Sequence, residues 1–153
     1  MSNKNPYGHA ADAYGNTAAE TDQRALEGKV LLKSARQLEE LSKRLGGDEK
    51  VPLTDIGDTI EYNRKLWMVF VNDTMNDEHP LPQEIKNNIA SLGIFVFKRS
   101  NEVLIDTTPE KIQALIDINR NIAAGLMKQR TSAKTEDAAP ADPPSEPSEP
   151  IIA

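Results

Sequence analysis

Apolar side chains recur at steps of three and four residues along positions 53–71, the spacing of one face of an α-helix. Within this stripe, Asn63 is polar, and Trp67 is the only tryptophan of the chain; Phe70 follows it on the same side. An amphipathic helix of this kind must bury its apolar face against other elements or a partner. The pattern therefore predicts a helix over residues 53–73 that the rest of the fold covers.

A long helix is predicted before this stripe. Its start is expected between Thr17 and Thr21, because both are capping residues that precede an apolar line ending at Leu45. Gly46 and Gly47 are expected to end it, since glycine accepts the left-handed conformation that many helix ends adopt. Gly28, in the middle, is either a close-packing point or simply tolerated.

The third apolar segment opens after Pro82, which is typical of a first helical turn. Residues 92–97 alone resemble a buried strand, but no second strand pattern is present to pair with them, so a helix is predicted. Because this helix is apolar on nearly all sides, it lies inside the bundle or presents Phe95 or Phe97 to a partner. Its main apolar line comprises Ile85, Ile89, Leu92, Val96 and Val103.

A fourth helix is predicted to begin at Pro109, with Thr108 as the cap, and to carry its apolar face to Leu126. From Lys128 onward, proline, glutamate and serine predominate, and such a segment is expected to be disordered. The prediction is an all-α, four-helix bundle-like domain over residues 17–127. Residues 1–16 form a flexible N-terminal segment and residues 128–153 a disordered tail.

Asn63 and Asn119 each interrupt an apolar stripe, and each is followed by arginine. Buried amides need hydrogen-bond partners, so the two helices are expected to cross with these side chains bonded to each other or to backbone. The alternative places both amides at a stripe edge, facing water. The residues predicted to build the core are Asn63, Trp67, Phe70, Leu92, Ile116 and Asn119.

Composition narrows the possible chemistry. The 153 residues include no cysteine, which excludes disulfides, thiolate catalysis and cysteine-based metal sites. His9 and His79 lie in a predicted tail and loop, without the spacing of a metal site or a catalytic triad. Asp55, Asp58 and Glu61 form an acidic row that a solvated helix face explains. A protein that is not an enzyme and binds no cofactor or metal is predicted.

Charge and hydropathy narrow the possible partners. The net charge of −6 disfavours broad binding to a phosphate backbone, so no DNA partner is expected and RNA is disfavoured. The sequence contains no apolar run long enough to cross a membrane, and its first 20 residues do not form a signal peptide. A cytoplasmic location without membrane contact is expected. Aromatic residues make up only 5%, so the core is thin and its stability depends on a partner.

Four segments resemble the FlaF family of flagellar biosynthesis regulators, and the likeness extends from about Tyr14 to Leu126. They are NRKLW (63–67), LPQEI (81–85), ASLG (90–93) and LIDINRNIAAGL (115–126). The resemblance implies a non-enzymatic cytoplasmic protein that binds flagellin before export, regulates its synthesis and works alongside the translational regulator FlbT. Flagellin's terminal segments, which are helical in the filament, are the implied clients.

Three functions remain open on the sequence. In the first, a flagellin chaperone binds client helices through the first and third helices, with contact side chains Tyr7, Tyr14, Leu32, Phe95 and Phe97. In the second, a post-transcriptional regulator contacts flagellin mRNA through basic residues of the first helix, namely Lys29, Lys33, Arg36, Lys43 and Arg44. In the third, the protein is a structural helical adaptor. The acidic residues between these cations and the lack of an aromatic stacking platform disfavour RNA.

Overall fold

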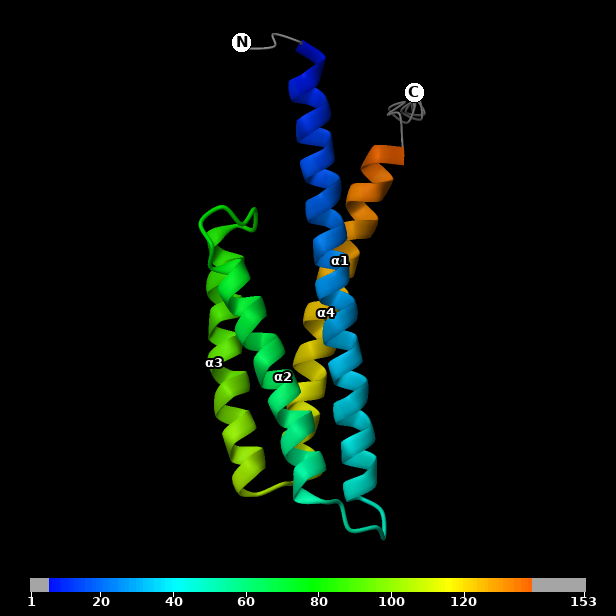
Figure 1. Ribbon diagram of the computed structural model, residues 1–153, viewed down its shortest axis with the longest axis vertical. Helices are drawn as coiled ribbons and strands as arrows, with labels where there is room; N and C mark the ends of the chain where they lie inside the picture. Colours follow the sequence, from blue (N-terminus) through cyan, green and yellow to red (C-terminus); the bar gives the residue numbers. More distant parts are fainter. Residues whose placement is uncertain (1–5, 139–153) are drawn as a thin grey trace, which may run out of the picture.

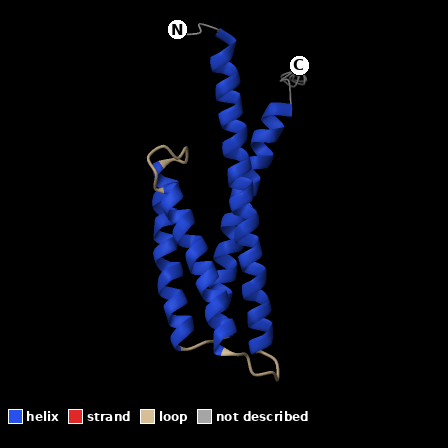
Figure 2. Cartoon of the chain, in the orientation of Figure 1, coloured by secondary structure: helices blue, strands red, loops and turns tan. Residues whose placement is uncertain are grey.

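The computed structural model describes the backbone of residues 6–138 and the side chains of residues 22–128. Within this part of the chain all the regular structure is helical (Figure 2), which confirms the all-α, four-helix prediction. The elements are α1 (Pro6–Leu45), α2 (Leu53–Thr74), α3 (Gln83–Ile105) and α4 (Pro109–Ala138).

The helices run alternately up and down (Figure 1), as short connections between neighbours require. α1 and α4 share the largest interface, α2 packs on α1 and α3, and α3 also packs on α4. α1 and α3 do not contact each other. The N-terminal part of α1 and the C-terminal part of α4 rise past the turn between α2 and α3, so the hairpin of α2 and α3 covers only part of the α1–α4 pair.

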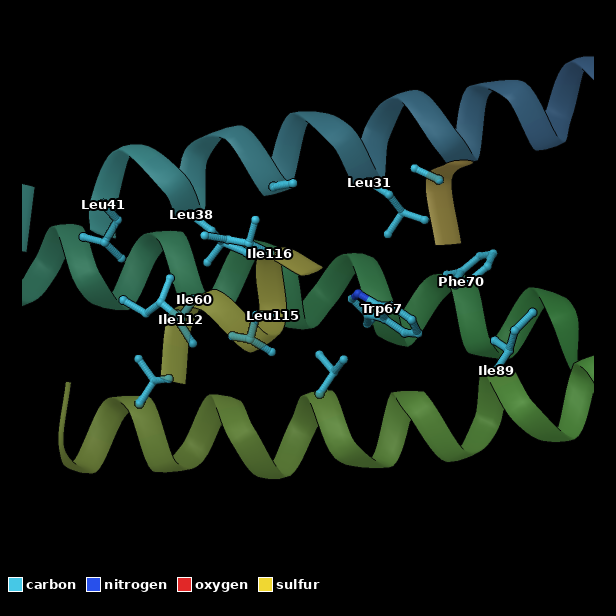
Figure 3. Packing of buried hydrophobic residues seen from close by; sticks show 14 of the residues in the cluster. Leu31, Leu38, Leu41, Ile60, Trp67, Phe70, Ile89, Ile112, Leu115 and Ile116 are labelled. Atoms are coloured by element: carbon cyan, nitrogen blue, oxygen red, sulfur yellow. The ribbon is translucent and has the colours of Figure 1, made fainter. Parts of the chain in front are cut away.

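Buried residues of α2 follow a heptad-like spacing of three and four: Ile56, Ile60, Asn63, Trp67, Phe70 and Thr74. Such spacing keeps one face of the helix toward its neighbours over its whole length. Trp67 is fully buried, and Phe70 lies next to it along α2 (Figure 3). Leu53, which the stripe included, is 83% exposed because it is the first residue of α2, at the end of the bundle.

Two helices extend further than the sequence indicated. α1 begins at Pro6 rather than between Thr17 and Thr21, since proline suits a first turn and the alanines of this segment favour helix more than its two glycines oppose it. Residues 6–16, counted in the flexible N-terminal segment, are therefore helical. α4 continues to Ala138, eleven residues into the predicted tail of 128–153, because helix-forming side chains continue until the approach to Pro140.

The third segment is a helix, as predicted, but it lies at the side of the bundle rather than inside it. Its buried face is Lys86, Ile89, Gly93, Val96, Ser100 and Val103. This face is turned relative to the predicted apolar line: Ile85 is 37% exposed, while Lys86 beside it is buried. The Lys86 ammonium donates a hydrogen bond to the Asn76 carbonyl oxygen at 2.7 Å, which explains how the turn between α2 and α3 accommodates a buried amine.

Glycines mark two close approaches between helices. A Cβ built at Gly93 would lie 2.6 Å from Cγ2 of Val71, so α3 meets α2 at a distance that only glycine permits. At Gly28 a Cβ would lie 3.1 Å from Met127 Cγ, which makes this glycine a packing point between α1 and α4. Gly46, by contrast, follows α1 without the expected left-handed conformation, and its N–H bonds to the Ser42 carbonyl oxygen.

Candidate functional site

A buried chain of polar side chains crosses the bundle from α1 to α4. The Ser34 hydroxyl donates to Oδ1 of Asn63 at 2.8 Å, and Nδ2 of Asn119 donates to the same oxygen at 2.7 Å. The Trp67 indole N–H donates to Oδ1 of Asn119 at 2.7 Å. All four side chains are fully buried. The two asparagines therefore meet across α2 and α4, in the arrangement that the stripe pattern predicts.

The tryptophan sets the direction of this chain. An indole N–H only donates, so Asn119 must turn its oxygen toward Trp67 and its amide nitrogen toward Asn63. Asn63 must then offer its oxygen, which accepts twice. Its own Nδ2 has no hydrogen-bond partner among the described residues. The cluster contains no ionisable group, so its role is structural: it fixes how α1, α2 and α4 are aligned.

Next to this cluster, α1 and α2 diverge and leave an apolar groove of about 160 Å³. We call it the α1–α2 groove. Leu26 and Val69 are 55% and 65% exposed on its two sides, although large aliphatic side chains are normally buried. Phe70 lies between them and packs edge-on against Trp67, with ring centroids 5.5 Å apart. The lining residues are Gln23, Leu26, Glu27, Val30, Leu31, Leu66, Val69, Phe70 and Asp73.

Two carboxylates interrupt this apolar lining, Glu27 on α1 and Asp73 on α2. Burial raises the pKa of Glu27, and the nearby Asp73 carboxylate raises it further. A hydrogen bond from Gln23 and the positive charge of Arg24 lower this pKa in part. Oε2 of Glu27 has no hydrogen-bond partner within the part of the chain that the structure describes. The groove thus combines aliphatic walls with an acceptor that the fold itself does not fully use.

Of the predicted partner-binding side chains, the structure describes those of Leu32, Phe95 and Phe97. Leu32 and Phe97 pack against the core, and only Phe95 faces outward, 37% exposed beneath the Arg99 guanidinium at 5.2 Å from its ring. Tyr7 and Tyr14 lie outside the residues whose side chains are described. α1 and α3 are not neighbours in the bundle, so their side chains would contact a partner at separate places, and docking through these two helices stays a prediction.

Sequence reasoning missed the role of Val69 and Asp73. Val69 lies off the buried stripe of α2, and the sequence pattern assigned it no role. The sequence does show an aliphatic residue, Val69, on an otherwise polar side of this helix, and an aliphatic Leu26 on the preceding helix. It could be interpreted only once the relative placement of the two helices was known.

Several charged residues that were candidates for other functions take part in ordinary surface contacts. Arg44 pairs with Asp55 at 2.9 Å, which connects the predicted RNA-contacting side of α1 to the acidic row of α2. Lys33 lies over the Tyr62 ring, 5.9 Å from its centroid. Among the described residues, acidic and histidine side chains form no group that could hold a metal ion, and no helix is long and apolar enough to cross a membrane.

Comparison with known families gives this arrangement its context. Residues 10–126 match the family model described as flagellar protein FlaF. The chain belongs to the FlaF family. The matched span includes α2, α3, the polar cluster and the α1–α2 groove, so these features lie within the FlaF domain itself. The searches of curated proteins and of solved structures returned no match.

Proposed function

We propose that this FlaF-family protein is a non-enzymatic, cytoplasmic flagellar assembly factor that binds flagellin before export and thereby regulates flagellin synthesis. The observation that carries the proposal is the α1–α2 groove, an apolar surface that the fold leaves open to solvent. Membership of the FlaF family supports the flagellar context. Flagellin is the implied client because its terminal segments are helical.

The dimensions of the groove suit a helix better than a small molecule. Its volume of about 160 Å³ is below the roughly 300 Å³ of typical ligand pockets. Its length, from Gln23 to Leu31 along α1, corresponds to about 12 Å of helix rise, or two turns. Amphipathic helices bind in such grooves through side chains spaced three and four residues apart. Leu26 and Val69 are placed to contact them on either side.

Direct mRNA contact is the less favoured alternative. Arg44, one of the cations proposed for this contact, is paired with an acidic residue. Glu39, also on α1, pairs with Arg120 of α4 at 2.6 Å. A structural adaptor without a flagellin contact would not require exposed aliphatic side chains beside a groove. Cooperation with FlbT is compatible with the proposal, since α3 offers a separate exposed surface that includes Phe95.

The decisive experiment is capture of purified flagellin by the full-length protein and by variants with Leu26→Asp or Val69→Asp. Each substitution places a charge in the groove without removing a buried side chain, so the fold is retained and binding falls at least tenfold, about 1.4 kcal/mol. Leu53→Asp and Ile105→Asp are matched controls, because these side chains are 83% and 86% exposed and lie outside the groove. Equal loss in all four variants, or in none, would refute docking in this groove.

Two further arms separate the alternatives. Phe95→Asp tests the outward side of α3 that the sequence favoured, and the groove proposal expects little effect from it. Added salt tests the nature of the contact: apolar docking persists at high salt, whereas binding to mRNA weakens steeply as condensed counterions compete. The RNA alternative would be favoured if flagellin binding were lost between low and moderate salt and if the protein also bound mRNA with a steep salt dependence.

A further inference from the structure

Glu27 is out of place in an apolar groove. Its side chain is half-buried between Leu26 and the aliphatic side of α2, and its Oε2 atom is closed to solvent without a hydrogen-bond donor among the described residues. Leaving a carboxylate oxygen in such a position costs free energy, because it loses water without gaining a donor. A fold that needed only an apolar wall at this point would gain from a leucine or glutamine instead.

Asp73 faces this carboxylate from the other side of the groove, close enough for the two charges to interact. Among the described residues, the cation that acts on Glu27 is Arg24, one turn earlier on the same helix. No ion pair between Asp73 and a cation is present in the described part of the chain. A second cation placed between them would offset their mutual repulsion and supply the missing donor.

We propose that the α1–α2 groove binds an amphipathic helix carrying a Lys or Arg among its apolar side chains, with the cation held between Glu27 and Asp73. The inference rests on the proposed function, since it specifies the client helix that the same groove accepts. The aliphatic side chains of the client contact Leu26 and Val69, and the cation reaches past Phe70 to the two carboxylates. The apolar contacts supply affinity, and the charge fixes the register and selects the partner.

Charge also excludes the chain's own C-terminal segment as the occupant. Residues 139–153 contain Asp142, Glu146 and Glu149 and neither lysine nor arginine, so this segment would add carboxylates to a site that already holds two. Like charges in contact disfavour binding. The occupant that fits is a basic amphipathic helix from another protein.

Three synthetic helical peptides test the inference without flagellin. They share an apolar face of leucines over about 18 residues, or five turns, and differ only at its centre, which is lysine, norleucine or glutamate. Calorimetric titration into the full-length protein is expected to give about tenfold tighter binding for the lysine peptide than for the norleucine peptide. The glutamate peptide is expected to bind most weakly.

Variants then assign the preference to the two carboxylates. In Glu27→Gln the lysine preference falls to less than about twofold, and in Asp73→Asn it falls in part. Asp58→Asn is the control, since it removes the same charge about 22 Å further along α2, outside the groove. Thermal unfolding of each variant establishes that the fold is intact.

Each outcome decides a different point. Equal affinity of the wild-type protein for lysine and norleucine peptides overturns the cation site. Tightest binding of the glutamate peptide overturns it as well and favours the chain's own acidic segment as occupant. Failure of all three peptides to bind overturns helix docking in this groove. Flagellin capture that depends on Leu26 while the peptides show no lysine preference retains the proposed function and rejects only this inference.

Discussion

Replacing Asn119 by leucine tests how much the hydrogen bonds of the buried polar cluster contribute to stability. Leucine has nearly the shape of asparagine, so the substitution removes hydrogen bonding with little change in volume. The Trp67 indole N–H would lose the acceptor it now has at 2.7 Å. Oδ1 of Asn63 would keep its hydrogen bond from Ser34. The Trp67 N–H is then the one buried donor of the cluster left without an acceptor.

The cost follows from that single unsatisfied donor. A buried group without its partner costs about 1–3 kcal/mol, and we expect the free energy of unfolding to fall by about 2 kcal/mol. For a domain of this size the melting temperature then falls by about 8 °C. Asn63→Leu is expected to cost more, about 3 kcal/mol, because it removes the oxygen that accepts from both Ser34 and Asn119 and leaves two buried donors without an acceptor. Loss of Asn63 Nδ2, which lacks a partner among the described residues, offsets part of this cost.

Urea unfolding followed by far-UV circular dichroism and by the emission of Trp67, the only tryptophan, measures both variants. Coincident transitions by the two probes establish that each variant unfolds as one unit. The predicted result is an order of stability: wild type, then Asn119→Leu, then Asn63→Leu. An Asn119→Leu protein as stable as the wild type, or one less stable than Asn63→Leu, would refute the direction of hydrogen bonding within the cluster.

Two other predictions concern α2 and its neighbours. Gly93→Ala forces a methyl group against Val71, and the overpacking cost of about 1–3 kcal/mol exceeds the roughly 1 kcal/mol gain in helix propensity, so the melting temperature should fall. Gly57→Ala is the control: it has open space around it, so its melting temperature should rise. A gain in both variants would contradict the close approach. Because the folded-state pKa of Glu27 is raised, the folded protein holds this proton more tightly, and stability falls as pH rises through that pKa. Glu27→Gln should therefore melt at a higher temperature than the wild type near pH 7.5. The difference in melting temperature should close near pH 4, below the ordinary glutamate pKa. The same difference at both pH values would exclude titration of Glu27 as its cause.

Helix number, order and most helix boundaries could be predicted from the sequence because they depend on local information. Pro82 and Pro109 mark helix starts, and the stripe through Trp67 identifies the buried face of α2. The outer ends of α1 and α4 were missed, because helix propensity outweighed the glycines and polar residues that indicated tails. The buried face of α3 was also misplaced, since polar Lys86 and Ser100 occupy core positions that an apolar pattern does not reveal.

The candidate site was less predictable than the fold. Asn63 and Asn119 could be paired in advance, because a buried amide needs a hydrogen-bond partner and these were the two asparagines on the predicted apolar stripes. The α1–α2 groove depends instead on the angle at which α2 leaves α1, and this angle is a property of the packed bundle. No single-helix pattern contains that information, so Leu26 and Val69 could not be assigned to one surface.

The pairing of α1 with α4 has a consequence for how the chain folds during synthesis. The first helix makes its most extensive interface with the last, across the longest sequence separation in the domain. The hairpin of α2 and α3 can form as soon as it leaves the ribosome, but α1 has no complete partner until α4 emerges. Contacts this distant in sequence slow folding, and the nascent chain meanwhile exposes the apolar face of α1. A growing chain stalled before residue 109 would therefore be a substrate for general chaperones, and release of the finished chain would end that dependence.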